Sequence, residues 1–136
     1  MHTNEIHKYS EKWNTRFAFF EQHGAPKTKE YKAAIRKEKF FRRYLFNMNF
    51  IAFFFGFIYF FILGLWRKNL SLLAIAVTID IIITMVEMTM DTPIPRGIDT
   101  CISIALASMW ASTANYAYYL KERRGSKSWN PFEGML

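Results

Sequence analysis

The chain has 136 residues, of which 51% are hydrophobic and 18% aromatic, and its formal net charge is +7. Its mean hydropathy is only -0.02, so the apolar residues are concentrated in a few stretches. Residues 44–66 carry no charge, and residues 70–90 and 98–120 are apolar with isolated acids. This pattern excludes an ordinary water-soluble globular domain and predicts one small membrane-embedded unit.

The sequence lacks the residues that most catalytic or metal sites require. The one cysteine, Cys101, has no partner for a disulfide or a cysteine-based zinc site, and His2, His7 and His23 have no zinc-ligand spacing. No serine hydrolase, P-loop or dinucleotide-binding motif is present. We therefore expect a non-catalytic protein without a metal ion or a cofactor.

Residues 1–43 are rich in Lys and Arg and predict a cytoplasmic hairpin of two amphipathic helices. Their polar start makes a cleaved signal peptide unexpected. Ser10 is a suitable N-cap and Gly24 a suitable stop for the first helix. The second helix is expected to begin near Thr28 and to continue through Tyr44 toward the membrane. The apolar face of the first helix consists of Trp13, Phe17 and Phe20.

This basic front half has three open interpretations. It binds an anionic lipid surface, it docks onto a partner protein, or it only anchors the chain. Nucleic acid binding is not expected, because a membrane segment follows the basic residues directly. The candidate lipid-surface residues are Lys37, Lys39, Arg42 and Arg43, together with Arg67 and Lys68 after the first apolar stretch.

The distribution of charge bears on how residues 44–66 meet the bilayer. If they enter and leave the same leaflet, all of the 18 Lys and Arg residues except Arg96 are cytoplasmic, as are both termini. We favour this re-entrant arrangement, with a bend near Gly56 and protein cover for the backbone. A full crossing stays open, because an uncharged helix of this length reaches about 27–30 Å.

The aromatic segment also carries a resemblance. It contains Asn49, Ala52, the run Phe-Phe-Phe-Gly at residues 53–56, Tyr59, Phe60 and the run Gly-Leu-Trp-Arg-Lys at residues 64–68. This pattern resembles the signature of an uncharacterised bacterial family of small inner-membrane proteins, a domain of unknown function. The resemblance implies an inner-membrane location and an arrangement of a polar amino-terminal helix, the aromatic segment and further apolar helices, and it implies no catalytic residue.

The segment departs from that family pattern in two places. Members commonly have a proline after the first glycine and often a basic residue before the later one, where this chain has Phe57 and Leu63. Both differences favour a continuous span of residues 44–66.

Asp80, near the middle of the second apolar stretch, is the sharpest candidate site. Thr84 and Glu87 fall on the same helical face. A carboxylate at this depth costs a few kcal/mol, so a function is expected for it, either contact with a partner helix or a proton or cation path. In the structural alternative, the acid is satisfied by polar side chains of the third stretch: Ser103, Ser108, Ser112, Thr113 and Asn115.

Pro93 and Pro95 predict a tight turn that joins two antiparallel membrane helices. Asp91, Arg96 and Asp99 are expected at the outer interface. Oxygen ligands there suit a divalent cation, but solvated surface charges are the favoured interpretation.

Small residues spaced four apart in the last apolar stretch predict close helix packing. The sequence leaves open whether they meet the same chain or a second copy. These residues are Ala107, Ser108, Ala111 and Ser112.

Together these features predict an all-α integral membrane protein with four parts. Residues 1–43 form the cytoplasmic helices, residues 44–68 the re-entrant or spanning aromatic segment, residues 69–120 a two-helix transmembrane hairpin and residues 121–136 a basic cytoplasmic tail. The favoured function is interaction within the bacterial inner membrane, as an immunity- or inhibitor-type protein that binds another membrane protein or a membrane-acting toxin. The alternative is an oligomeric proton or cation channel, or a transporter component. The expected partners are the lipid bilayer and either a membrane protein or a second copy.

Overall fold

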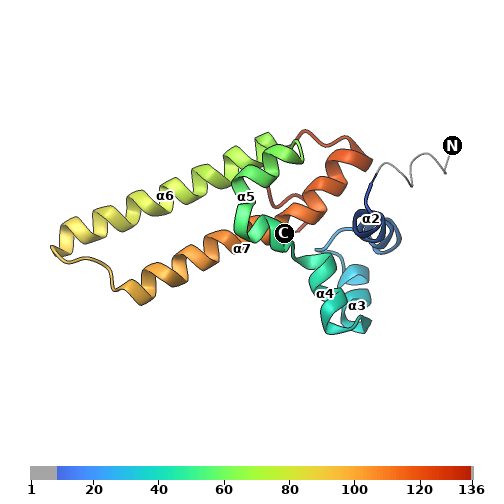
Figure 1. Ribbon diagram of the computed structural model, residues 1–136, viewed down its shortest axis with the longest axis horizontal. Helices are drawn as coiled ribbons and strands as arrows, with labels where there is room; N and C mark the ends of the chain where they lie inside the picture. The colour runs from blue at the N-terminus through green and yellow to red at the C-terminus, as the bar shows by residue number, and fades with distance from the viewer. Residues whose placement is uncertain (1–8, 136) are drawn as a thin grey trace.

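The computed structural model describes residues 9–135, and within them every regular element is an α-helix (Figure 1). This confirms the all-helical part of the predicted fold. Two long helices form an extended hairpin, and the shorter helices gather around one end of it, which we call the base; the opposite end is the tip (Figure 1). The helices are α2 (Glu11–His23), α3 (Lys29–Lys37), α4 (Phe40–Asn47), α5 (Phe50–Ile62), α6 (Trp66–Met90) and α7 (Arg96–Arg124).

Helix α2 begins at the predicted N-cap Ser10, and α3 begins directly after Thr28, where the sequence predicts the start of the second helix. The hydroxyl of Ser10 accepts a hydrogen bond from the backbone N–H of Trp13 at 3.4 Å, and that of Thr28 accepts one from Tyr31 at 3.2 Å. Helix α2 ends at Gly24, whose φ of 84° lies in a region that glycine enters without strain.

The apolar face of α2 packs against α7. Phe17 and Phe20 are both buried, and their rings lie 5.8 Å and 5.3 Å from the ring of Tyr119. Trp13 lies against Tyr118 with 4.6 Å between the ring centres. The same chain therefore covers this face, which leaves the basic side of the front half as the part that could meet a lipid surface or a partner.

The second amphipathic helix is divided in two at Glu38, which has extended backbone with a ψ of 151°. Arg43 donates hydrogen bonds to the carbonyl oxygens of Arg36 at 2.6 Å and Glu38 at 2.9 Å. Arg42 pairs with the Glu38 carboxylate at 2.8 Å. Arg43 thus supplies donors to the carbonyls at the end of α3, where the chain turns, and the prediction of one continuous helix is wrong.

Two polar side chains fasten α4 to the helices before it. Arg16 of α2 is buried, and its Nε donates to the carbonyl oxygen of Leu45 at 2.7 Å. Burial lowers the pKa of Arg16. The buried phenol of Tyr31 donates to Oδ1 of Asn47 at 2.6 Å, and burial raises the pKa of Tyr31. The front helices are thus tied to the start of the aromatic segment.

Residues 44–66 are not one continuous helix. Met48 and Asn49 have extended backbone, which separates α4 from α5. Helix α5 bends at Phe55, where φ is -128° and ψ is 26°, directly before the glycine at which the sequence predicts a bend. Its 13 residues span about 20 Å, less than the roughly 30 Å of a bilayer core. Helix α5 crosses the base of the hairpin instead of running along it (Figure 1).

Helices α6 and α7 run antiparallel from the base to the tip, as the sequence predicts (Figure 1). At the tip Asp91 has a left-handed backbone with a φ of 50° and ends α6. The Glu87 carboxylate accepts a hydrogen bond from the backbone N–H of Ile94 at 2.8 Å, which holds the turn.

The packed cores lie at the base. One joins α2, α3 and α4 to the end of α7, and the other joins α5, α6 and α7. By contrast, no residue between 73 and 109 is buried, and we call this region the distal arm. The largest fully buried apolar side chains of the two cores are Phe17, Phe20, Phe46, Phe60, Leu72 and Tyr119.

Two stretches are long and apolar enough to cross a membrane, Phe40–Ile62 and Trp66–Met90. The protein buries only 22% of the first apolar window and 11% of the second, so most of their side chains face outward. The break before α5 interrupts the first stretch, and α7 is less apolar than α6. The two apolar stretches with outward-facing side chains suggest a membrane protein.

Gly56 permits the close approach of α5 to α7, because a Cβ there would lie 2.5 Å from Cγ of Trp110. We expect Gly56→Ala to destabilise the protein by about 1–3 kcal/mol through overpacking, although alanine favours helix. Gly97 of α7 has open space around its Cβ position, so Gly97→Ala is the matched control and should be neutral or slightly stabilising. Thermal unfolding in detergent measures both, and a stabilised Gly56→Ala variant would contradict the packing.

Candidate functional site

Buried amide side chains hold α4 and α5 against α7. Nδ2 of Asn115 lies within hydrogen-bond distance of the carbonyl oxygens of Leu45 (3.2 Å), Phe46 (3.1 Å) and Met48 (2.9 Å). Oδ1 of Asn115 accepts a hydrogen bond from Nδ2 of Asn49 at 3.1 Å. The carbonyls lie where α4 ends and have no helical continuation, so Asn115 replaces the donors that a longer helix would supply.

Asn49 completes this junction from the other side. Its backbone N–H donates to the carbonyl oxygen of Ala111 at 3.0 Å, and its Oδ1 accepts from the N–H of Ala52 at 3.1 Å. Asn49 and Asn115 are only 2% and 1% exposed, so water does not compete for these groups. The broken backbone between α4 and α5 is therefore satisfied by protein.

Asn69 of α6 forms a second bridge, just beyond the bend in α5. Its Nδ2 donates to the carbonyl oxygen of Phe57 at 2.8 Å, and its Oδ1 accepts from the indole N–H of Trp110 at 2.9 Å. No motif in the sequence points to Asn69 or Trp110. Their only signal is a polar or amphipathic side chain beside an apolar stretch, and nothing in the linear spacing places residue 69 against residue 57.

Asp80, Thr84 and Glu87 lie along one side of α6 but do not form a joint site. Asp80 is exposed, and within residues 9–135 its carboxylate has no hydrogen-bond or ion-pair partner. The hydroxyl of Thr84 donates to the backbone carbonyl of Asp80 at 3.0 Å, and Glu87 is engaged in the turn.

The structural alternative for Asp80 is not formed. The Asn115 amide lies at the base with α4, and the hydroxyls of α7 each donate to carbonyls of their own helix. These hydroxyls belong to Ser103, Ser108, Ser112 and Thr113.

The charged residues at the tip, Asp91, Arg96 and Asp99, are all exposed. Within the described part of the chain, no group of three His, Cys, Asp or Glu side chains is placed to hold a metal ion. His2 and His7 lie outside the described residues. The exposed tip residues are therefore separate surface charges in this structure.

Two of the four predicted packing residues of α7, Ala107 and Ala111, meet α5 and its cap in the same chain. Ala107 borders a small hollow of 90 Å³ together with Ala52 and Gly56 of α5, and the buried Ala111 accepts the bond from Asn49. Ser108 and Ser112 bond only to their own helix within the described residues. The small residues of α7 therefore let the bent helix α5 pack closely against it.

The six predicted lipid-surface cations separate into three groups. Lys37 and Lys39 are exposed, whereas Arg42 and Arg43 bind the end of α3. Arg67 and Lys68 instead lie at the base, where they line a cavity.

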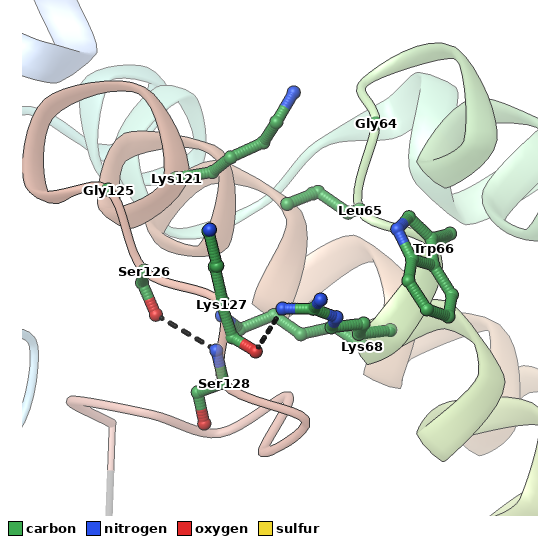
Figure 2. Close-up of a pocket in the computed structure, with 10 residues that line it drawn as sticks. Gly64, Leu65, Trp66, Lys68, Lys121, Gly125, Ser126, Lys127 and Ser128 are labelled. Atoms are coloured by element: carbon green, nitrogen blue, oxygen red, sulfur yellow. Dashed lines mark hydrogen bonds between the residues drawn. The ribbon is translucent and has the colours of Figure 1, made fainter.

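This cavity, which we call the base pocket, has a volume of 320 Å³. Figure 2 shows Lys121 of α7 and Lys127 of the tail facing Gly64, Leu65 and Trp66 across it. The ten lining residues are Gly64, Leu65, Trp66, Arg67, Lys68, Lys121, Gly125, Ser126, Lys127 and Ser128.

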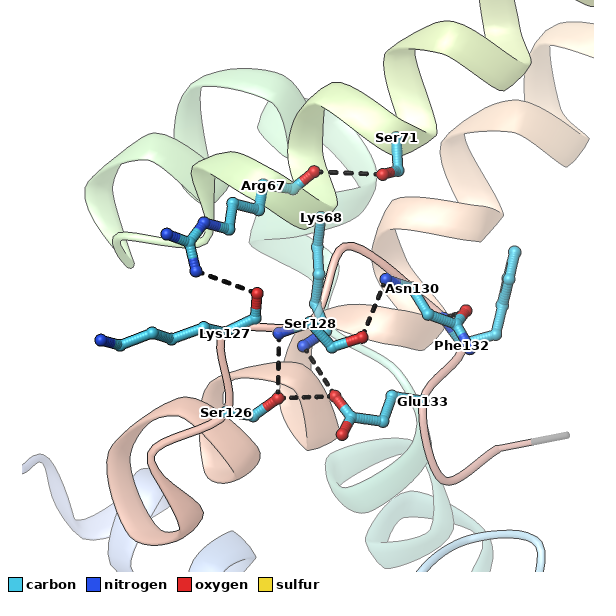
Figure 3. A network of polar contacts seen from close by, with 9 residues as sticks. All are labelled: Arg67, Lys68, Ser71, Ser126, Lys127, Ser128, Asn130, Phe132 and Glu133. Carbon is cyan, nitrogen blue, oxygen red and sulfur yellow. Dashed lines mark hydrogen bonds and ion pairs between the residues drawn. The ribbon is translucent and has the colours of Figure 1, made fainter.

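The carboxyl-terminal tail folds back to form one wall of the base pocket (Figure 3). Lys68 is only 3% exposed, and its ammonium pairs with Glu133 at 3.2 Å. Ser126 donates to the same carboxylate at 2.7 Å. Arg67 donates from Nη1 to the carbonyl oxygen of Lys127 at 3.0 Å, while its buried Nε has no partner among the described residues. The sequence predicted only a basic tail here, because the contacts join residues far apart in the chain.

Comparison with known proteins gives the family. The model of the DUF2628 family, described as a protein of unknown function, matches residues 6–124. The chain belongs to the DUF2628 family. This confirms the resemblance to a bacterial domain of unknown function, and the match extends well beyond the aromatic segment that suggested it. The match to the family model ends at residue 124, so the pocket residues of the tail, 125–128, lie outside it.

Relatives of the DUF2628 protein cover nearly the whole chain. The uncharacterized protein YigF of Escherichia coli (strain K12) is 36% identical over 125 residues, which are 89% of this chain and 90% of the relative. The uncharacterized protein YigF of Salmonella typhimurium is 32% identical over 125 residues, with the same coverage. No solved structure matches the chain.

The amide junction predicts a specific loss of stability. Asn115→Leu keeps the side-chain volume but leaves the α4 carbonyls without a donor, and each unsatisfied buried polar group costs about 1–3 kcal/mol. We expect thermal unfolding in detergent to show a destabilisation of at least about 2 kcal/mol. Ser108→Ala, which removes a hydroxyl bonded within its own helix, should change stability by less than about 0.5 kcal/mol. Equal effects of the two substitutions would contradict the role of Asn115.

Proposed function

We propose that this DUF2628 protein is an integral protein of the bacterial inner membrane with both termini in the cytoplasm. In this topology α6 and α7 cross the bilayer as a hairpin, and α5 enters only part of the cytoplasmic leaflet. The bend and the short length of α5 support this arrangement, and so do the amide side chains that satisfy the break before it.

The charge distribution supports the same orientation. Residues 9–43, the start of α6, the end of α7 and the tail all lie at the base, and every Lys and Arg of the described chain except Arg96 lies in these segments. Positively charged segments favour the cytoplasmic side, so the base faces the cytoplasm and the tip faces outward.

Single cysteines test this topology in spheroplasts of a bacterial host. In a Cys101→Ser background, Thr92→Cys at the exposed tip is expected to react with a membrane-impermeant maleimide in intact spheroplasts. Glu30→Cys, on the exposed side of α3, is expected to react only after lysis. Reaction of Glu30→Cys in intact spheroplasts would show that the base faces outward, opposite to the proposal. Protection of Thr92→Cys would mean that the hairpin does not cross the membrane.

Within the membrane, we propose a non-catalytic role in binding another membrane protein, of the immunity or inhibitor type. The observation that carries this role is Asp80, an exposed carboxylate in an apolar helix that has no partner within residues 9–135. A carboxylate that faces hydrocarbon without a partner is costly, so a binding partner that supplies a donor at this depth gains free energy from the contact.

The partner is best described as a transmembrane helix with a basic or hydrogen-bond-donating side chain at the depth of Asp80. Apolar side chains of α6 beyond the base, among them Val77, Ile81 and Met85, are exposed and offer the surrounding contact area. Flexible methionines adapt to the shape of such a helix. A second copy is a poorer fit, because it would bring a like charge to the same place.

Capture from native membranes in mild detergent tests this role. The full chain and the Asp99→Asn control, which changes an exposed acid near the tip, should recover the same membrane protein. Asp80→Leu should reduce its recovery by about 5–30-fold, since an interhelical polar contact is worth about 1–2 kcal/mol. Unchanged recovery with Asp80→Leu would contradict the role of this residue.

The same experiment separates the alternative function. Recovery of further copies of this chain alone, with ion flux in liposomes that Asp80→Asn abolishes, would favour the oligomeric proton or cation path. The polar side of α6 with Asp80, Thr84 and Glu87 is the feature such a path would use.

A further inference from the structure

The base pocket combines positive charge, unused hydrogen-bond donors and tryptophan side chains at one edge. We propose that it binds the phosphate group of an anionic phospholipid from the cytoplasmic leaflet. The lipid origin of the phosphate rests on the membrane placement proposed above, whereas the chemistry of binding rests on the pocket itself.

The charge of the pocket is only partly balanced. Its walls hold four cationic side chains, and none of its ten lining residues is acidic. Glu133 pairs with Lys68 at 3.2 Å, and Glu122 reaches Lys121 at 3.5 Å. The other two cations, Arg67 and Lys127, have no carboxylate partner among residues 9–135. The pocket therefore keeps an excess of positive charge that an anion would balance.

Arg67 has donors in reserve. Among the described residues its guanidinium makes one hydrogen bond, through Nη1, and its buried Nε has no partner. An unsatisfied buried N–H is costly, and the planar guanidinium matches two oxygens of one phosphate. A small rotation toward the pocket would present the free edge of Arg67 to an anion held there.

The amino terminus of α6 adds backbone donors. The residue before the helix, Leu65, provides no side-chain cap, and the first residues of α6, Trp66, Arg67 and Lys68, all line the pocket. The first backbone N–H groups of a helix have no partner within it and carry partial positive charge. They favour phosphate at this end of the 25-residue helix.

Two tryptophans point to a lipid as the source of the phosphate. The rings of Trp66 and Trp129 meet edge to face with 5.3 Å between their centres, and they are 44% and 51% exposed. Tryptophan gathers at the level of the lipid headgroups, where one side of the ring is apolar and its N–H is wet. This pair therefore lies where the phosphate of a lipid would meet Arg67 and Lys127.

Nanodiscs of phosphatidylcholine alone, or with an added fraction of phosphatidylglycerol, test the proposal with the full chain. We expect phosphatidylglycerol to raise the thermal stability of the protein in a saturable way. Lys127→Gln should weaken this effect about fivefold, because a cation near the headgroup is worth about 1 kcal/mol. The Lys127 side chain makes no hydrogen bond or ion pair within residues 9–135, so this variant is expected to fold. Arg67→Lys keeps the charge, loses the planar fork and should show a comparable loss.

Lys39→Gln, which removes an exposed cation outside the pocket, is the matched control and should leave the lipid effect unchanged. Equal losses in Lys39→Gln and Lys127→Gln would overturn the proposal in favour of diffuse surface attraction, and so would a response without saturation. Inorganic phosphate in neutral detergent is the probe for a soluble ligand. Stabilisation by millimolar phosphate without any response to phosphatidylglycerol would overturn the lipid source. Capture of a partner protein through Asp80 is independent of these variants, so failure here leaves that role untouched.

Discussion

The fold depends on the hydrogen bonds that two buried asparagines give to the backbone where α4 ends and α5 begins. Asn115 supplies donors to the last carbonyls of α4, and Asn49 caps α5 and bonds to α7. Without these amides the break would leave bare polar groups in an apolar setting, and a continuous helix would be more favourable. The amides therefore make a short, bent α5 possible and fix where it crosses α7.

This junction divides the molecule into two physically different halves. At the base, aromatic side chains of α2, α3 and α5 pack on α7, and Gly56 and Ala111 let the backbones approach closely. In the distal arm, residues 73–109, no side chain is buried. A pair of apolar helices with so little contact between them relies on its surroundings for cover. The proposed lipid and protein contacts supply that cover, and Asp80 gives the partner contact its polar anchor.

The base also collects the charge. Lys68 is buried because Glu133 returns to it from the tail, and Arg43 is held by the end of α3. Two other cations of the base pocket, Arg67 and Lys127, have no carboxylate partner among residues 9–135, and the uncapped end of α6 lies beside them. In the proposed topology this end meets the cytoplasmic leaflet, so positive charge that orients the chain would also bind individual lipid phosphates. The cations of the base pocket would then both orient the chain in the membrane and bind the lipid phosphate.

The sequence by itself determined the local features of this protein. The apolar stretches and the Ser10 cap predicted helices, the prolines predicted the hairpin turn, and the aromatic segment pointed to the family, because each depends on residues close together in the chain. It did not reveal the break at Glu38, where Arg43 takes the place of helical donors. It also missed the bridge from Asn69 to Phe57 and the fold-back of Glu133 onto Lys68. Only the tertiary structure decided these features, because a buried polar group chooses its partner by distance in space, and partners separated by tens of residues leave no periodic signal in the sequence.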